Sequence, residues 1–182
     1  MQYGLRTNIH PDTWRSFLPE LIRFCHEAHI DEVLLSEESY HIATVVQSED
    51  FFHRVAAAYC EIVPILKAEG LIPSMYIKVS MGHYEGYVED MPSFSRFVGD
   101  DLQPSPAAPC GMDPAWQRYI SRVCADCARA GFTRLYLDDD FRSDNHFQGR
   151  AGCFCDLHVQ ATSRRCGVEL TPETLRAHVC GN

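Results

Sequence analysis

Short apolar segments alternate with longer segments of helical periodicity in this chain, and this alternation restricts its fold more than any other feature. The apolar segments predict four β-strands, at residues 3–8, 32–36, 72–80 and 133–137. Helices are expected from about Asp12, over 49–69, from Asp113-Pro114 to Gly131, and near 156–166 and 172–179. Strands joined through helices pair in parallel, so the pattern predicts an α/β protein with a parallel sheet.

Two architectures fit such a pattern, a β/α barrel and an open doubly wound sheet. No glycine-rich phosphate loop follows the first strand, which disfavours a dinucleotide-binding sheet. Polar or acidic residues follow the strands, which favours a barrel because barrel active sites lie at the carboxyl ends of the strands. The chain has 182 residues, whereas a closed eight-stranded barrel needs roughly 250. We therefore expect residues 1–182 to form a partial, truncated domain, the N-terminal four β/α units of a TIM (β/α)8 barrel.

Composition excludes several kinds of partner. A formal net charge of -9 argues against binding to nucleic acid, because phosphate contacts need a basic surface. No apolar run approaches the roughly 20 residues of a membrane span, and residues 1–6 do not resemble the start of a signal peptide. We expect a cytoplasmic protein. A half barrel would have two open sheet edges, so a homo-oligomer or a missing C-terminal half barrel is the expected partner.

An acidic run directly follows the fourth predicted strand. Asp138, Asp139 and Asp140 are adjacent, and Arg142 comes two residues later. Neighbouring carboxylates repel, so at least one should bind its proton more tightly than a free aspartate, as a general acid requires. Arg142 is near enough to orient a carboxylate or a substrate hydroxyl. A solvated acidic loop and a site for magnesium or calcium remain alternatives.

Nine cysteines include one cluster with the spacing of metal ligands. Cys153, Cys155 and His158 lie within six residues, and sulfur and imidazole ligands together favour zinc. Cys110, between Pro109 and Gly111, is the best fourth ligand, with Cys166 and His146 in reserve. Free thiols or one disulfide at Cys153 are the alternatives. The remaining cysteines of interest fall on predicted helices, where packing is expected: Cys25, Cys60, Cys124 and Cys127.

These motifs resemble the zinc-containing β-galactosidases of glycoside hydrolase family 42. In that family the fourth barrel strand ends in Asp-Asn-Glu, whose Glu is the acid/base, and a Cys-x-Cys-x-x-Cys trio with one earlier cysteine binds structural zinc. The resemblance implies catalysis at Asp139 and Asp140, and a structural zinc ion on Cys110, Cys153, Cys155 and His158. Asp140 replaces the family's Glu, and His158 replaces its last cysteine. The specific motifs lie only in 110–158.

The resemblance implies a carbohydrate substrate and a glycoside hydrolase-like function. The expected contacts with sugar follow the strands: Asp138, Arg142, Arg6, Asn8 and Glu37. The family's nucleophile lies on the seventh strand, so these 182 residues alone are not expected to hydrolyse glycosides. Two alternatives stay open. One is a metal-dependent barrel hydrolase that binds a catalytic ion through residues 138–140 and His146; the other is a non-catalytic, zinc-stapled remnant or interaction module.

Overall fold

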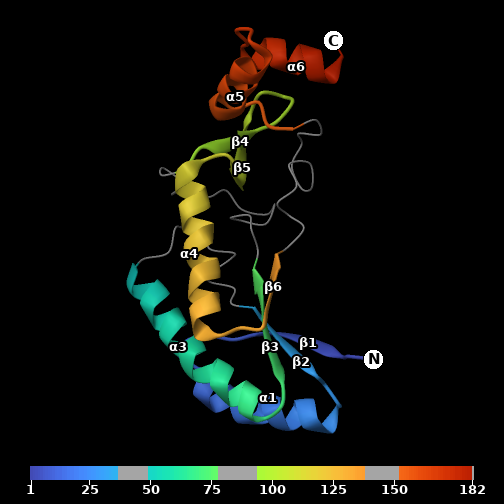
Figure 1. Ribbon diagram of the computed structural model, residues 1–182, viewed down its shortest axis with the longest axis vertical. Helices are drawn as coiled ribbons and strands as arrows, with labels where there is room; N and C mark the ends of the chain where they lie inside the picture. Colours follow the sequence, from blue (N-terminus) through green and yellow to red (C-terminus); the bar gives the residue numbers. More distant parts are fainter. Residues whose placement is uncertain (37–48, 78–93, 138–151, 182) are drawn as a thin grey trace. The chain divides into compact units, whose positions relative to one another are not determined.

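The computed structural model describes residues 1–36, 49–77, 94–137 and 152–181 (Figure 1). The chain divides into two compact units. Unit 1 comprises Met1–Ala43, Gln47–Lys78 and Ser121–Asp138, and unit 2 comprises Thr44–Val46, Val79–Ile120 and Asp139–Asn182.

Unit 1 contains a parallel four-stranded sheet. Its strands are β1 (Gly4–Asn8), β2 (Glu32–Ser36), β3 (Ile72–Ile77) and β6 (Arg134–Leu137). They pair in the order β1-β2-β3-β6, each parallel to its neighbour. The helices between them are α1 (Trp14–Glu27), α3 (Glu49–Ala68) and α4 (Pro114–Ala130), of which α4 enters unit 1 at Ser121. The prediction of an α/β fold with a parallel sheet is confirmed, and the order of the strands is compatible with a barrel.

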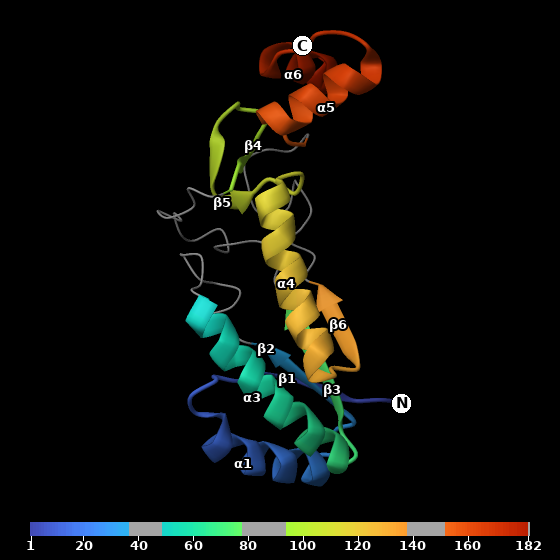
Figure 2. The ribbon, with the colours of Figure 1, turned by 60° about the vertical axis from the view of Figure 1, so that its left-hand side comes forward.

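One face of this sheet forms the core of unit 1. Val33, Leu35, Met75 and Ile77 alternate along β2 and β3 and are completely buried. Helices α1 and α3 lie over one face of the sheet (Figure 2), and each carries a stripe of buried apolar side chains. The stripes are Trp14, Leu18, Leu21 and Cys25 on α1, and Val55, Tyr59, Ile62 and Leu66 on α3. Strands that are apolar on one face and helices with one apolar stripe can bury both only against each other.

Unit 2 combines a β-hairpin with two short helices. β4 (Arg96–Val98) pairs antiparallel with β5 (Pro104–Pro109), and α5 (Asp156–Cys166) and α6 (Pro172–Cys180) follow later in the chain. Phe154, Val159 and Leu175 form a small buried cluster beside Val98 and other partly buried apolar side chains. The first turns of α4 belong to this unit, and Trp116 there packs edge-on against Phe94 with ring centroids 5.4 Å apart.

The sequence located most of these elements to within a few residues, with three errors. The first helix was expected from about Asp12, but α1 begins at Trp14 with Thr13 at the cap position, and the Asp12 carboxylate accepts two hydrogen bonds of 3.1 Å from Arg54. No element was predicted between the third strand and Asp113, where the structure has the β4–β5 hairpin. Its second strand, Pro-Ser-Pro-Ala-Ala-Pro, is rich in proline, which has no amide hydrogen to donate to a neighbouring strand. The sequence of this segment therefore does not resemble a strand. Cys60 is exposed, whereas Cys25 and Cys127 are buried as expected.

Candidate metal centre

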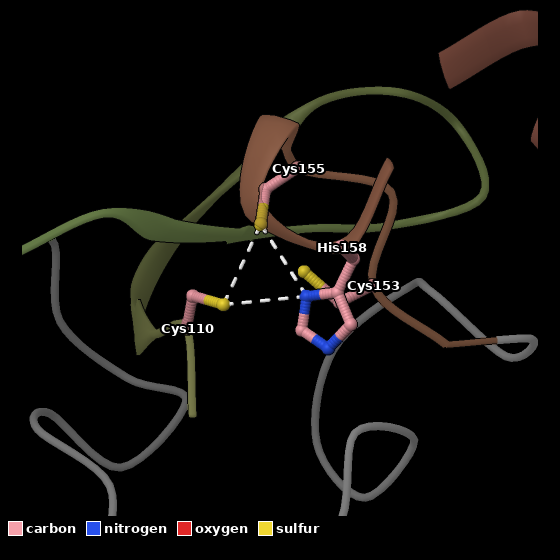
Figure 3. A group of neighbouring side chains, drawn as sticks. All are labelled: Cys110, Cys153, Cys155 and His158. Carbon is pink, nitrogen blue, oxygen red and sulfur yellow. Dashed lines mark hydrogen bonds between the residues drawn. The ribbon is translucent and has the colours of Figure 1, made fainter. Parts of the chain in front are cut away.

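Three thiols and one imidazole converge in unit 2 (Figure 3). Cys110 directly follows β5, Cys153 and Cys155 precede α5, and His158 lies in the first turn of α5. One ligand atom from each of the four lies within 4.8 Å of the others. These are the four residues that the sequence predicted as metal ligands, and their arrangement could hold a metal ion.

Backbone hydrogen bonds bring the two ligand segments to the same place. The Cys110 amide donates to the Ser95 carbonyl oxygen at 2.7 Å, which fixes Cys110 at the start of β4. The Phe154 amide donates to the Val98 carbonyl oxygen at 2.8 Å, which attaches the segment before α5 to the same strand. The hairpin is therefore the scaffold of the site, because both ligand segments bond to β4.

The distances between the ligand atoms fit tetrahedral zinc. The Cys110 and Cys155 sulfurs are 3.4 Å apart, and each lies 3.4 Å from His158 Nδ1. Bonds of about 2.3 Å to sulfur and 2.0–2.1 Å to nitrogen at tetrahedral angles separate such ligands by roughly 3.5–3.8 Å. Binding an ion would need the Cys110, Cys155 and His158 atoms to spread by only a few tenths of an ångström, and Cys153 Sγ lies within 4.8 Å of them.

Two backbone amides donate hydrogen bonds to sulfurs of the cluster. The Val98 amide donates to Cys153 Sγ and the Met112 amide to Cys110 Sγ, both at 3.4 Å. Cys110 is completely buried and Cys155 nearly so, whereas Cys153 and His158 are half-buried. Amide donors offset part of the negative charge that two or three thiolates concentrate in a low-dielectric site.

The protons of the cluster are strongly redistributed in the absence of an ion. Hydrogen bonds from Cys110 and Cys153 hold the pKa of Cys155 far below that of a free thiol. Hydrogen bonds to Cys153 and Cys155 raise the pKa of His158 to about 10. Hydrogen bonding to the same two cysteines raises the pKa of Cys110. A thiolate–imidazolium group results, and a metal ion must displace its protons to bind.

Other predicted site residues lie elsewhere. Arg6 and Asn8, the predicted sugar contacts, lie on β1 in unit 1. Cys166, a reserve ligand, is exposed at the end of α5 and is not part of the cluster. Several predictions lie outside the described residues: Glu37, Asp138, Asp139, Asp140, Arg142 and His146.

A polar network on the sheet was not predicted. Glu32, whose side chain is 11% exposed, accepts hydrogen bonds from the Ser74 hydroxyl, from Arg134 at 2.7 Å and from Tyr136 at 3.1 Å. On the same face the Arg6 guanidinium stacks on the Tyr76 ring at 3.8 Å. The alternation of polar and apolar residues in β3 and β6 was the available signal, because it assigns Ser74, Tyr76, Arg134 and Tyr136 to one face.

Comparison with known proteins adds no family. The chain matches no model of a known protein family and no curated protein. Among the described helices, none combines the length and apolar character needed to cross a bilayer.

Proposed function

We propose that this chain is part of a carbohydrate-active β/α barrel, in which one structural zinc ion joins the connections that follow the third and fourth parallel strands. The observation that carries the proposal is the convergence of Cys110, Cys153, Cys155 and His158 within 4.8 Å. Cys110 belongs to the connection after β3, and the other three belong to the connection after β6.

The donor set argues for zinc in a structural role. Three sulfurs and one imidazole complete a tetrahedron and leave no position for water or substrate, which is typical of structural rather than catalytic zinc. Calcium and magnesium prefer oxygen ligands, and the cluster offers none. Hydrogen bonds from the Val98 and Met112 amides to the sulfurs orient Cys153 and Cys110.

Two features support the barrel part of the proposal. Parallel strands in sequential order, with α1 and α3 on one face, are what successive β/α units of a barrel produce. In addition, Leu137 ends β6 and three aspartates follow it directly in the sequence, where a barrel carries its catalytic groups. The assignment of Asp140 as acid/base and the choice of carbohydrate as substrate rest on the resemblance to the β-galactosidase motifs.

Metal analysis of the purified protein tests the zinc site. We expect one zinc per chain by plasma mass spectrometry. We also expect that replacing zinc by Co²⁺ gives the intense visible absorption of a tetrahedral thiolate site. Cys155→Ser should lose the metal, whereas Cys166→Ser, an exposed cysteine at the other end of α5, should retain it. Less than about 0.2 zinc per chain after exposure to micromolar zinc at pH 7.5 would contradict the proposal.

Sugar binding tests the carbohydrate part separately. Calorimetric titration with a panel of oligosaccharides should find a ligand whose affinity falls at least tenfold in Asp140→Asn, while Cys166→Ser is unchanged. We expect no hydrolysis of aryl glycosides by the isolated chain, because the resemblance assigns the nucleophile to a seventh strand. A panel that gives no binding would remove carbohydrate as the substrate class, and turnover that disappears in Asp140→Asn would contradict the expectation of inactivity.

A further inference from the structure

Most exposed apolar side chains of unit 1 fall in two groups, one on β6 and one on α1 and the residue before β1. Around β6, Leu135, Tyr136 and Leu137 are 36%, 40% and 55% exposed. Around β1, Tyr3, Phe17 and Phe24 are 54%, 37% and 48% exposed. Apart from Met1, the one other large hydrophobic of unit 1 that is exposed among the described residues is Ile65.

The leucines of β6 continue the buried face of the sheet. Leu135 pairs with Met75 and Leu137 with Ile77, and both of these β3 partners are completely buried. The same face is therefore covered at β3 and open at β6. This difference arises because β6 is an edge strand in the described sheet.

The phenylalanines of α1 lie on the flank that faces away from α3. Pro19 and Ile22 line a groove between α1 and α3 together with Ile65. At 100° per residue, Phe17 and Phe24 fall together on the other side of the buried stripe, away from α3. Among the described strands, β1 is the edge strand opposite to β6. Each of the two edge strands of the described sheet is thus accompanied by an exposed apolar flank.

We propose that a second copy of this chain covers both edges, with β6 of each copy pairing in parallel with β1 of the other. This inference rests on the proposed barrel. A two-fold axis along the strands keeps all strands parallel and joins two sets of four, and eight is the number of strands in a closed TIM-type barrel. Leu135 and Leu137 of β6 then lie against Tyr3, Phe17 and Phe24 of the partner at each of two equivalent junctions, and Tyr136 lies on the opposite face of the sheet with Glu32.

The exposed area is sufficient for a specific dimer. An aromatic side chain buries about 150–250 Å² when fully covered, so six side chains exposed by roughly 35–55% offer on the order of 500 Å² at each junction. Two junctions give about 1,000 Å² before any backbone or polar contact is included, which reaches the lower size of a specific interface. Charge does not oppose the closure, because Glu32 and Arg134 neutralise each other on the open face.

Light scattering coupled to size exclusion, at about 5–200 µM chain, tests the proposal. We expect a mass twice that of one chain, and at least a tenfold weaker dimer in Leu137→Lys and in Phe24→Glu, one on each side of the junction. Val179→Lys, at a valine of α6 with 53% exposure, is the matched control and should dimerise normally. Circular dichroism checks folding, and Phe24→Glu changes only an exposed helix position, so it remains informative if Leu137→Lys unfolds.

A monomer at 200 µM would overturn the proposal. The alternative would then be that further β/α units of the same polypeptide pair with the two edge strands. A dimer that survives both edge substitutions would also overturn it. The zinc content of the same samples separates this result from the proposed function: a zinc-loaded monomer removes the dimer alone, and a zinc-free dimer removes the metal site alone.

Discussion

Removal of zinc should destabilise unit 2 strongly, since among the described residues α5 and α6 contact the hairpin mainly through a small apolar cluster and a hydrogen bond from Arg176 to the Asp100 carbonyl oxygen. The apolar cluster that joins them has three buried side chains, Phe154, Val159 and Leu175. Burying such side chains stabilises by about 1.5–3 kcal/mol each, or roughly 5–9 kcal/mol together. The two helices contain 11 and 9 residues, and helices this short are only marginally stable without tertiary support. Coordination of a metal ion by Cys153, Cys155 and His158 should therefore contribute much of the stability of this part of unit 2.

The size of the effect follows from binding linkage. Free zinc at about 1,000 times its dissociation constant stabilises the folded state by about 4 kcal/mol. For a domain of 60–100 residues, each kcal/mol shifts the midpoint of thermal unfolding by about 4–8 °C. We therefore expect the transition of unit 2 to fall by roughly 15–30 °C when zinc is chelated. Unit 1 has its own core beneath α1 and α3, so its transition should change little.

Thermal melts monitored by circular dichroism and by calorimetry, with buffered zinc and with chelator, measure this shift. Cys166→Ser should behave as wild type, and Cys155→Ser should melt like the chelated protein at any zinc concentration. If zinc-loaded and chelated protein unfold within about 2 °C of each other, the metal does not support the fold and the structural role is wrong.

Three further predictions concern other parts of the chain. Glu32→Ala should lower the free energy of unfolding, measured in urea, by about 2–3 kcal/mol, because the buried Ser74 hydroxyl loses its acceptor. Glu20→Ala, at a side chain that is 72% exposed, is the control and should change it by less than about 0.5 kcal/mol. Asp113 caps α4. Burial of its carboxylate raises the pKa, but hydrogen bonds from the amides of Ser95, Ala115 and Trp116 have the larger effect, so the pKa is lowered. Asp113→Ala should therefore reduce the free energy of unfolding by about 1–2 kcal/mol at pH 7. The contribution of its charge is complete above the unfolded pKa of about 3.9 and is lost as pH falls through the lower folded pKa, so the deficit of Asp113→Ala should shrink in acid. Alkylation at pH 8 should label the exposed Cys60 and Cys166 first and spare Cys25 and Cys127, because burial raises the pKa of the Cys25 thiol and raises that of Cys127 to about 12. Chelation of the metal should make Cys110, Cys153 and Cys155 reactive as well. Equal labelling rates for these three cysteines with and without chelator would argue against protection by a metal ion.

The parts of the fold that the sequence predicted are those with strong local periodicity. The stripe Trp14, Leu18, Leu21, Cys25 specifies a helix without reference to the rest of the chain, and Asp113 followed by proline specifies where α4 begins. The hairpin escaped prediction because β4 has three residues and β5 contains three prolines. Its pairing depends on tertiary contacts, among them the bonds from Cys110 to Ser95 and from Phe154 to Val98, and no local pattern records them.

The metal cluster and the Glu32 network show where prediction of sites from sequence succeeds and fails. Three of the four candidate metal ligands lie within six residues, so residue type and spacing were enough to group them. Glu32, Ser74 and Arg134 are all common residue types. Ser74 and Arg134 lie 42 and 102 positions from Glu32 in the sequence. Only the register, which aligns Ser74 with Arg134 and places β2 beside β3, brings them together. Glu32, at the start of β2, therefore becomes a candidate for a buried network only once strand order is known. The same register places the exposed Leu135 and Leu137 of β6 beside the buried Met75 and Ile77 of β3.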